Sequence, residues 1–395
     1  MATDTNPQKI EDLLSRGVEE VIDKEHLKKQ LKSGKKLRVK LGIDPTSPNI
    51  HIGRSIPLLK LRDFQELGHQ IVLIIGDFTG VIGDTSDKDS ERPMLTEKQI
   101  KENMKSYIQQ AEKLIDIKKC EVRHNSEWLG KLDYHEIGRQ ADTFSLAEFI
   151  ARENIKKRLT EGKRISLREV LYPLMQGYDS VVIKADVELG GTDQRFNLLA
   201  GRELQERYGQ EPQDILTNPL IAGLDGRKMS SSWGNVINLF DPANEMFGKI
   251  MSLKDELIED YLKLCTRLPL TEIEQMKKEM TNPRDLKTAL AKEIVKMYHG
   301  EKAAAKAGEE FNKVFQKKGL PSRMPQWQAV KEEYPILDLL FESGLTPSKA
   351  EAKRMVAGKA VEINGQLKTD WQERIKIEND MVIQVGKRKF VRVKI

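Results

Sequence analysis

Blocks of apolar and polar positions in the first part of the chain predict a βαβ unit. Residues 37–43 alternate as a strand does and run into the turn-rich segment 44–49. Apolar side chains then recur at near-helical spacing from 54 to 67, and Gly68 ends the helix. The continuous apolar run 71–75 is typical of a buried parallel strand. The loop before the helix therefore lies at the carboxyl end of the first strand, where open α/β sheets bind nucleotides.

The rest of the chain predicts an α/β fold followed by a helical part and a small α+β part. Residues 97–165 are mostly helical around a short strand at 120–123, so they are interpreted as a helical insertion, and the sheet is expected to resume near 181–185. This Rossmann-like parallel-sheet domain spans 1–240. A helical stretch follows at 241–325 and ends in a Gly- and Pro-containing linker. The tail, 333–395, is expected to hold a helix and short strands with a hairpin at Asn364-Gly365.

Composition predicts a soluble, cytoplasmic protein. Hydrophobic residues make up 38% and charged residues 32% of the chain, and no apolar run approaches the ~20 residues of a membrane helix, so no membrane partner is expected. The first residues have neither a basic flank nor an apolar stretch, which argues against a signal peptide. Cys120 and Cys265 lie far apart, which excludes a cysteine-based zinc site and a disulfide framework.

The positive charge of the chain is concentrated at its end. The whole chain carries a net +5, and residues 341–395 carry 12 Lys and Arg against 7 Asp and Glu, which is the same +5. A compact basic module at one end is expected of a nucleic-acid-binding domain. The alternative is charge that simply keeps a small domain soluble.

Two segments far apart in the sequence predict a phosphate-binding site. His51-Ile52-Gly53-Arg54 begins a predicted helix, where backbone N–H groups favour phosphate and Gly53 lets a purine approach the backbone. The segment from Lys228 to Ser232 can close over a triphosphate and place Lys228 on departing pyrophosphate. The alternatives are a capping or surface histidine and a solvated Gly/Ser loop.

Polar residues between these segments predict the other half of a site. Tyr172, Gln176 and Asp179 are spaced at i, i+4 and i+7, which places them on one face of a helix. The alternative is an ordinary surface face. Gly190 and Gly191 end the next strand and permit close backbone approach, and Asp193 can accept hydrogen bonds from ribose hydroxyls.

Together these residues resemble the class I aminoacyl-tRNA synthetases, and most closely the bacterial tyrosyl-tRNA synthetases. His51 to Arg54 stands where the family has its HIGH motif, and Lys228 to Ser232 where it has KMSKS. The tail is similar to a small RNA-binding domain of ribosomal-protein type. The resemblance implies a catalytic domain at 1–240 with a KMSKS-like loop at 224–234, an α-helical anticodon-binding domain at 241–325 and an RNA-binding domain at 333–395.

The resemblance also implies the reaction and the residues that carry it. Tyrosine is activated by ATP, supplied as its Mg²⁺ complex with no protein-held metal, and is then transferred to tRNA(Tyr) by an enzyme that is a homodimer through the insertion. Implied catalytic residues are His51, Thr46, Lys88, Arg92 and Lys228. Implied ATP-binding residues are Asp44, His51, Gly53, Arg54, Gly191, Asp193 and Lys228. Implied tyrosine-binding residues are Thr79, Asp84, Tyr172, Gln176, Asp179 (for the tyrosine hydroxyl) and Gln194. Implied RNA-binding residues are Lys349, Lys353, Arg354, Lys387 and Arg388.

Four positions depart from the family pattern. Arg54 replaces the second HIGH histidine, and Ser231 replaces the second KMSKS lysine, which shifts the task of charge neutralisation toward Arg227, Lys88 and Arg92. Lys40 stands where many tyrosyl enzymes have a tyrosine that contacts the substrate hydroxyl, which leaves Asp179 as the main specificity determinant. The remaining departure is the added negative charge around Lys88, from Asp87 and Asp89.

Three alternatives remain open from the sequence. A tryptophanyl-tRNA synthetase shares the catalytic fold, but the basic tail and Asp179 argue against it. A nucleotidyltransferase uses a similar phosphate loop, but it is expected to lack the helical region and the tail. A synthetase-like RNA-binding protein without aminoacylation is suggested by Arg54 and Ser231 and opposed by the intact substrate-binding positions.

Overall fold

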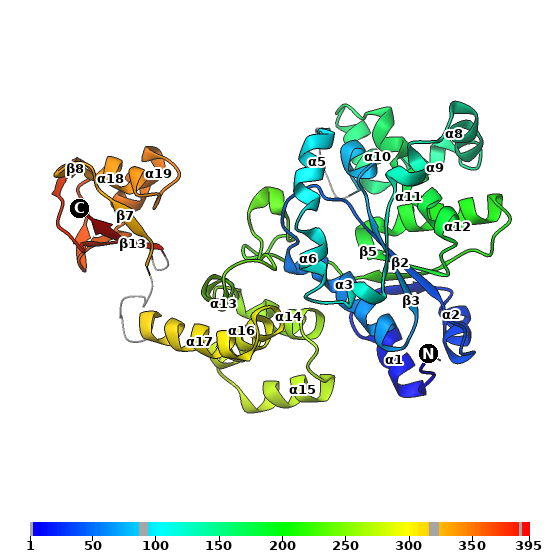
Figure 1. The fold of residues 1–395 in the computed structure, drawn as a ribbon, viewed down its shortest axis with the longest axis horizontal. Coiled ribbons are helices and arrows are strands. Elements are labelled where there is room, and N and C mark those ends of the chain that lie inside the picture. Colours follow the sequence, from blue (N-terminus) through cyan, green and yellow to red (C-terminus); the bar gives the residue numbers. More distant parts are fainter. Residues whose placement is uncertain (1–2, 87–93, 316–323, 387–388) are drawn as a thin grey trace. The chain divides into compact units, whose positions relative to one another are not determined.

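The computed structural model describes residues 3–86, 94–315, 324–386 and 389–395, whose elements are arranged as in Figure 1. Contacts divide the chain into two compact units: residues 1–242 with 249–300, and residues 243–248 with 301–395. Within the described ranges, no helix is long and apolar enough to cross a membrane.

The first unit is built around a twisted sheet, for which the described residues provide six strands in the order β1-β6-β5-β2-β3-β4. These strands are β1 Glu20–Ile22, β2 Arg38–Ile43, β3 Gln70–Ile75, β4 Glu121–His124, β5 Val187–Gly191 and β6 Asp214–Asn218. Neighbouring strands are parallel, except that the edge strand β1 is antiparallel to β6. The predicted α/β fold with a parallel sheet is therefore confirmed.

Two crossovers place helices on both faces of this sheet. β2 leads through α3 (Ile52–Glu66) to β3 on one side, whereas β5 leads through α12 (Arg195–Arg207) to β6 on the other side. Because such crossovers are right-handed, the two helices cover opposite faces. The carboxyl ends of β2 and β5 meet where the strand order reverses, which is where sheets of this type bind ligands.

The remaining helices of the first unit surround this centre (Figure 1). Those with bounds before β6 are α1 Pro7–Ser15, α2 Lys24–Lys32, α4 Thr79–Ile82, α5 Glu97–Met104, α6 Tyr107–Ala111, α7 Ser126–Leu129, α8 Tyr134–Ala141, α9 Leu146–Ile150, α10 Glu153–Thr160 and α11 Leu167–Ile183. After β6 come α14 Ile258–Cys265, α15 Leu270–Glu279 and α16 Pro283–His299, and α13 Ala243–Met251 spans the division between the units. Short 3₁₀ turns lie at Ile117–Lys119, Thr192–Gln194, Ser231–Trp233 and Asp255–Leu257.

The helices between residues 249 and 300 pack onto the sheet domain, so the contacts do not divide the chain at the predicted boundary near 240. The hydroxyl of Tyr298 in α16 donates to Ser55 Oγ of α3 at 3.0 Å. The guanidinium of Arg16 donates to the carbonyls that follow α14, those of Thr266 at 2.9 Å and Leu268 at 2.8 Å. The guanidinium also donates to the carbonyl of Lys263 at 3.2 Å, in the last turn of α14, where carbonyl groups have no partner within the helix.

Two predictions for the central part of the chain are corrected. The apolar run at 181–185 is not a strand: α11 continues to Ile183, and Lys184 ends it in a left-handed conformation with φ 51°. A short apolar run has no periodicity that separates a buried helix end from a buried strand. The short strand expected inside the helical insertion is β4, which pairs with β3 in the main sheet, so the insertion is interrupted by a strand of the core.

The second unit holds the basic tail. Its elements are α17 Glu301–Phe315, β7 Gln326–Gln328, β8 Glu333–Pro335, α18 Ile336–Glu342, α19 Lys349–Ala357, β9 Val361–Ile363, β10 Gln366–Lys368, β11 Arg374–Lys376, β12 Val382–Val385 and β13 Lys389–Lys394. Asn364 and Gly365 both have positive φ and join β9 to β10, as the hairpin signal predicted. A core that includes Tyr334, Leu339 and Val361 closes within residues 329–393.

Candidate active site

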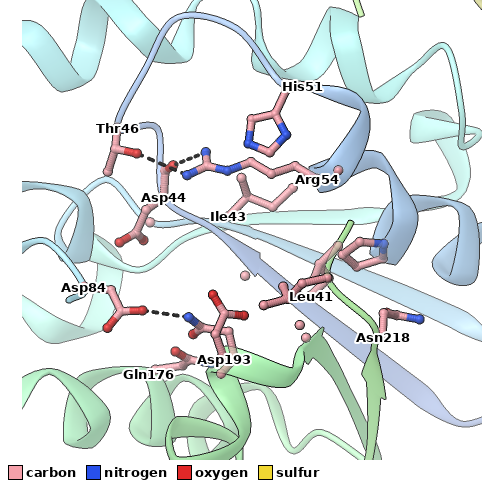
Figure 2. A pocket seen from close by; sticks show the side chains of 18 of the residues that line it. Leu41, Ile43, Asp44, Thr46, His51, Arg54, Asp84, Gln176, Asp193 and Asn218 are labelled. Carbon is pink, nitrogen blue, oxygen red and sulfur yellow. Dashed lines mark hydrogen bonds between the residues drawn. The ribbon is translucent and has the colours of Figure 1, made fainter. Parts of the chain in front are cut away.

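A cavity of about 540 Å³ opens at the carboxyl ends of β2 and β5. In Figure 2, His51, Thr46 and Arg54 lie on one side of it, and Asp84, Gln176 and Asp193 lie on the other. Its lining includes every described residue that the sequence assigned to catalysis, ATP or tyrosine, namely Asp44, Thr46, His51, Gly53, Arg54, Thr79, Asp84, Tyr172, Gln176, Asp179, Gly191, Asp193, Gln194 and Lys228. Lys88 and Arg92, with Asp87 and Asp89, lie outside the described residues.

The first side of the cavity presents the N-terminus of α3. His51 is the N-cap residue of this helix and is buried, and a methyl group on Gly53 would come within 3.1 Å of its ring. The guanidinium of Arg54 donates to Thr46 Oγ1 at 3.2 Å and to the Tyr107 hydroxyl at 3.3 Å. A cation in the first turn of a helix is unfavourable beside the positive end of the helix dipole, and an anion bound there removes this penalty.

The loop that carries Lys228 is held by side-chain hydrogen bonds. Asn235 accepts from the N–H of Ser230 at 2.8 Å and donates to Asp225 at 2.7 Å. The hydrogen bond from Asn235 and the contacts with Arg227 lower the pKa of Asp225 to about 2. Arg227 pairs with Asp225 and stacks over the Trp233 ring at 4.7 Å, so it supports the loop rather than the cavity.

Lys228 itself reaches across to the opposite wall. Its Nζ atom lies 3.0 Å from Asp193 Oδ2, and the two side chains are 30% and 19% exposed. The residue expected on the phosphates and the residue expected on the ribose are therefore within hydrogen-bond distance of each other.

A buried carboxylate, Asp179, lines the cavity, and the part of the cavity around it is called the inner end. It accepts hydrogen bonds from Trp128 Nε1 at 2.8 Å and Asn125 Nδ2 at 3.3 Å. Burial raises its pKa to about 7, although the charge of Lys40 and these two hydrogen bonds act in the opposite direction. The apolar side chains of Leu41 and Ile74 also line the cavity. An aromatic ring with a hydroxyl at its tip therefore fits this end chemically.

Asn125 and Trp128 were missed by the sequence analysis. Both follow β4, which had been assigned to the helical insertion and is in fact the neighbour of β3. The signal was present, because a polar residue directly after a parallel strand lies at the ligand-binding edge of the sheet. Tyr107, assigned only to the apolar stripe of a helix, is likewise a partner of Arg54.

A second carboxylate, Asp44, lies between the two sides of the cavity. It accepts hydrogen bonds from Thr79 Oγ1 at 2.7 Å and from the Tyr172 hydroxyl at 2.8 Å. Burial raises its pKa to about 6. Gly76 is required beside it, because a Cβ there would lie 2.0 Å from Asp44 Oδ1.

Lys40 does not line the cavity. It is fully buried beneath it and forms an ion pair with Glu188, its neighbour on β5, at 2.8 Å. It also donates to Ser180 Oγ at 2.7 Å and to the carbonyl of Gln176 at 2.9 Å. A buried charge has to be paired in this way, because desolvation without a partner costs several kcal/mol, on the order of 3–5 when one partner is removed.

The predicted RNA-binding residues that the structure describes lie on α19. Lys349 pairs with Asp338 at 2.8 Å, Arg354 pairs with Glu351, and Lys353 lies 3.8 Å from the centre of the Trp371 ring. Lys387 and Arg388 lie outside the described residues. Within the described ranges, no group of three His, Cys, Asp or Glu side chains could hold a metal ion.

Comparisons with known proteins identify the relatives of this chain. The family of tRNA synthetases class I (W and Y) matches residues 32–316, and the tyrosine–tRNA ligase SYY-like C-terminal domain matches residues 316–393. A tyrosine–tRNA ligase of Thermotoga maritima is 48% identical over 98% of both chains. One of Moorella thermoacetica is 46% identical over 96% of this chain and 94% of its own.

A solved structure also resembles this fold. The tyrosyl-tRNA synthetase of Archaeoglobus fulgidus complexed with L-tyrosine aligns with a TM-score of 0.62 at 26% identity, covering 77% of this chain and 100% of that one. Sequence and fold therefore point to the same family.

Proposed function

We propose which residues carry each step of the reaction, on the premise that the chain belongs to the class I tyrosyl-tRNA synthetases and is a tyrosine–tRNA ligase. The tyrosine carboxylate attacks the α-phosphate of ATP, which forms tyrosyl-adenylate and releases pyrophosphate. The terminal ribose hydroxyl of tRNA(Tyr) then attacks the adenylate carbonyl and releases AMP. Neither step requires a protein nucleophile, so the residues act by placing the substrates and by offsetting charge.

The side of the cavity formed by the start of α3 binds ATP. His51 and Arg54 donate hydrogen bonds to phosphate oxygens, with Thr46 beside them, and Gly53 and Gly191 leave room for the nucleoside. Asp193 accepts from the ribose hydroxyls, which releases Lys228 to neutralise the departing pyrophosphate. The support is the placement of Arg54 against Thr46 and of Lys228 against Asp193. Mg²⁺ arrives bound to the phosphates of ATP and supplies further charge neutralisation there.

The inner end of the cavity binds tyrosine. Ionised Asp179 accepts a hydrogen bond from the substrate hydroxyl. Asp84, Gln176 and the hydroxyl of Tyr172 receive the α-ammonium group, with Thr79 and Gln194 supporting them. In phenylalanine complexes the buried carboxylate would lack this partner, and a buried acceptor without a partner is costly.

The observation that carries this assignment is the burial of Asp179 between Trp128 and Asn125 at the apolar end of the cavity. The test is ATP–pyrophosphate exchange with tyrosine, phenylalanine and tryptophan compared side by side. Asp179→Ala should abolish the preference for tyrosine over phenylalanine. Asp214→Ala is a matched control, since Asp214 is also buried with a raised pKa of about 6 but lies outside the cavity. Unchanged selectivity in Asp179→Ala would contradict the assignment.

The basic tail is proposed to bind tRNA(Tyr). Lys349, Lys353 and Arg354 share one helix, which gives a cationic face suited to phosphates. Lys387 and Arg388 add to the positive charge of the same tail in the sequence. Charge reversal at Lys353 and Arg354 should raise the KM for tRNA and leave pyrophosphate exchange unchanged. Equal effects on both assays would contradict an RNA-binding role.

The enzyme is proposed to be a cytoplasmic homodimer that pairs through the helical insertion. Exposed apolar side chains support this, since Tyr134 is 92%, Leu146 is 66% and Leu159 is 49% exposed. Light scattering after gel filtration should give twice the mass of 45.2 kDa. Leu146→Lys should then shift the mass toward the monomer, and a monomeric wild type would contradict the proposal.

A further inference from the structure

Asn197 links two of the proposed tyrosine-binding side chains from behind. It lies in α12, is fully buried, and is absent from the lining of the cavity. Its Nδ2 atom donates to Gln176 Oε1 at 3.1 Å and to Gln194 Oε1 at 3.1 Å, and Ser86 Oγ is a more distant acceptor at 3.3 Å. Asn197 therefore connects α11 with the turn that follows β5.

The far ends of these two amides determine which way each one faces. Gln176 donates through Nε2 to Glu188 Oε1 at 3.1 Å, and Gln194 donates through Nε2 to Asp84 Oδ2 at 2.7 Å. Turning either amide over would place its oxygen against a carboxylate, so both carbonyl oxygens have to face Asn197. Only a group with two hydrogens on one atom can donate to both oxygens from that place, and the amide nitrogen of Asn197 is such a group.

Glu188 is itself immobilised under the cavity. Lys40 pairs with it at 2.8 Å, Ser180 Oγ donates to it at 3.0 Å and Gln213 Nε2 donates to it at 2.5 Å. Every one of these groups is buried. A rigid ion pair therefore holds one end of the network, and Asp84, which lines the cavity, is the other end. Figure 2 shows the hydrogen bond at the Asp84 end, with Gln176 nearby.

The energetic cost of burying the Asn197 side chain indicates that its donor hydrogens are the important part of it. In the part of the chain that the structure describes, Asn197 Oδ1 is buried and has no hydrogen-bond partner. A buried acceptor without a partner destabilises a fold, so packing alone does not favour asparagine at this position. The two donor hydrogens are what the residue contributes.

We propose that Asn197 is a positioning residue for tyrosine: it fixes the carbonyl oxygen of Gln176 and, through Gln194, the carboxylate of Asp84 in the orientation that receives the substrate's α-ammonium group. This inference rests on the proposed function of the cavity. Each amide oxygen has a second lone pair, so the bond from Asn197 leaves Gln176 able to accept from the ammonium as well.

The test is steady-state pyrophosphate exchange with Asn197→Ala and Asn197→Ser. For Asn197→Ala the KM for tyrosine should rise roughly tenfold, the size expected when a hydrogen bond to a charged group is misaligned. The kcat at saturating tyrosine and the KM for ATP should change less than about twofold on that scale. Serine has one donor hydrogen and can hold only one of the amides, so Asn197→Ser should be intermediate.

Two inhibitors separate positioning from general damage to the fold. Tyramine keeps the ammonium group and lacks the carboxylate, whereas 3-(4-hydroxyphenyl)propanoate lacks the ammonium group. Asn197→Ala should lose affinity for tyramine and keep its affinity for the propanoate. Equal losses for both inhibitors, or none for either, would overturn the inference. Gln205→Ala is the matched control, because Gln205 is a buried amide of the same helix and should lower the melting temperature without changing either affinity.

A parallel variant keeps this inference separate from the proposed function. Gln176→Met should also raise the KM for tyrosine. If Gln176→Met leaves that KM unchanged, the assignment of the α-ammonium site is wrong. If Gln176→Met raises it and Asn197→Ala does not, only the positioning inference is wrong. If Asn197→Ala melts below the assay temperature, Asn197→Ser is measured in its place. A KM for tyrosine above that of the wild type then supports the inference, and an unchanged KM contradicts it.

Discussion

Replacing Asp179 with asparagine should stabilise the fold at alkaline pH while it removes the carboxylate proposed to accept from the tyrosine hydroxyl. Burial raises the pKa of folded Asp179 to about 7, whereas an unfolded aspartate titrates near 3.9. Between these values the folded state keeps the proton and the unfolded state has lost it. Because stability falls with pH wherever the folded state binds more protons, this group lowers stability as pH rises from about 4 to 7, and the loss then levels off.

The size of the effect follows from the two pKa values. A difference of about 3 pKa units corresponds to roughly 4 kcal/mol at full ionisation, of which about 2.6 kcal/mol develops between pH 5 and pH 8. Asparagine does not titrate, so it avoids this loss. It presents one acceptor where Asp179 presents two, and leaving the donor of Trp128 or Asn125 unpaired costs about 1–3 kcal/mol at every pH.

The assay is urea unfolding of wild type and Asp179→Asn at pH 5 and pH 8, followed by fluorescence. The difference in unfolding free energy between the two proteins should move in favour of the variant by about 2–3 kcal/mol between these pH values. The constant hydrogen-bond cost cancels in this comparison, so the shift reports the titration alone. An equal difference at both pH values would show that Asp179 is not the group that ionises, and the reasoning from its burial would be wrong.

Three further predictions test other parts of the cavity. Trp128→Phe removes a donor to Asp179 and should raise the KM for tyrosine about tenfold, with the KM for ATP unchanged, in pyrophosphate exchange. Arg54→Ala should lower kcat of exchange on the order of 10²-fold, because the guanidinium lies against Thr46 on the ATP side. Arg54→Lys should recover part of this loss. A change below twofold in Arg54→Ala would contradict a phosphate-binding role for Arg54. Asp193→Ala should raise the KM for ATP on the order of tenfold and leave the KM for tyrosine unchanged in the same assay.

The sequence predicted the parts of the site that follow local rules. His51 at a helix start, Gly190-Gly191 at a strand end and the spacing of Tyr172, Gln176 and Asp179 each depend on neighbours within a few residues, and all of them line the cavity. The parallel α/β fold was predictable for the same reason, since βαβ units have short-range patterns.

The site residues that the sequence did not predict depend on which segments of the chain meet in space. β4 was assigned to an insertion because its pattern is too short to show which sheet it joins, and Asn125 and Trp128 were missed with it. Asn197 sits in an ordinary helix, and its role follows only from contacts across elements. Lys40 stands where many tyrosyl enzymes have a tyrosine that contacts the substrate hydroxyl, and only its register with Glu188 shows that it lies under the cavity.

The charges of the cavity are separated in a way that links tyrosine binding to proton release. Cations line the ATP side, whereas Asp44 lies between the two sides with Asp84 near it. Burial, and after it the charge of Asp84, raises the pKa of Asp44 to about 6. An α-ammonium group bound beside Asp44 favours the ionised form of this carboxyl group, so it lowers the pKa of Asp44. Tyrosine binding near pH 6 should therefore release protons, which calorimetry in buffers of different ionisation enthalpy measures directly. It follows that tyrosine affinity rises with pH through this range, and an affinity that is constant from pH 5.5 to 8 would contradict the coupling of Asp44 to the substrate.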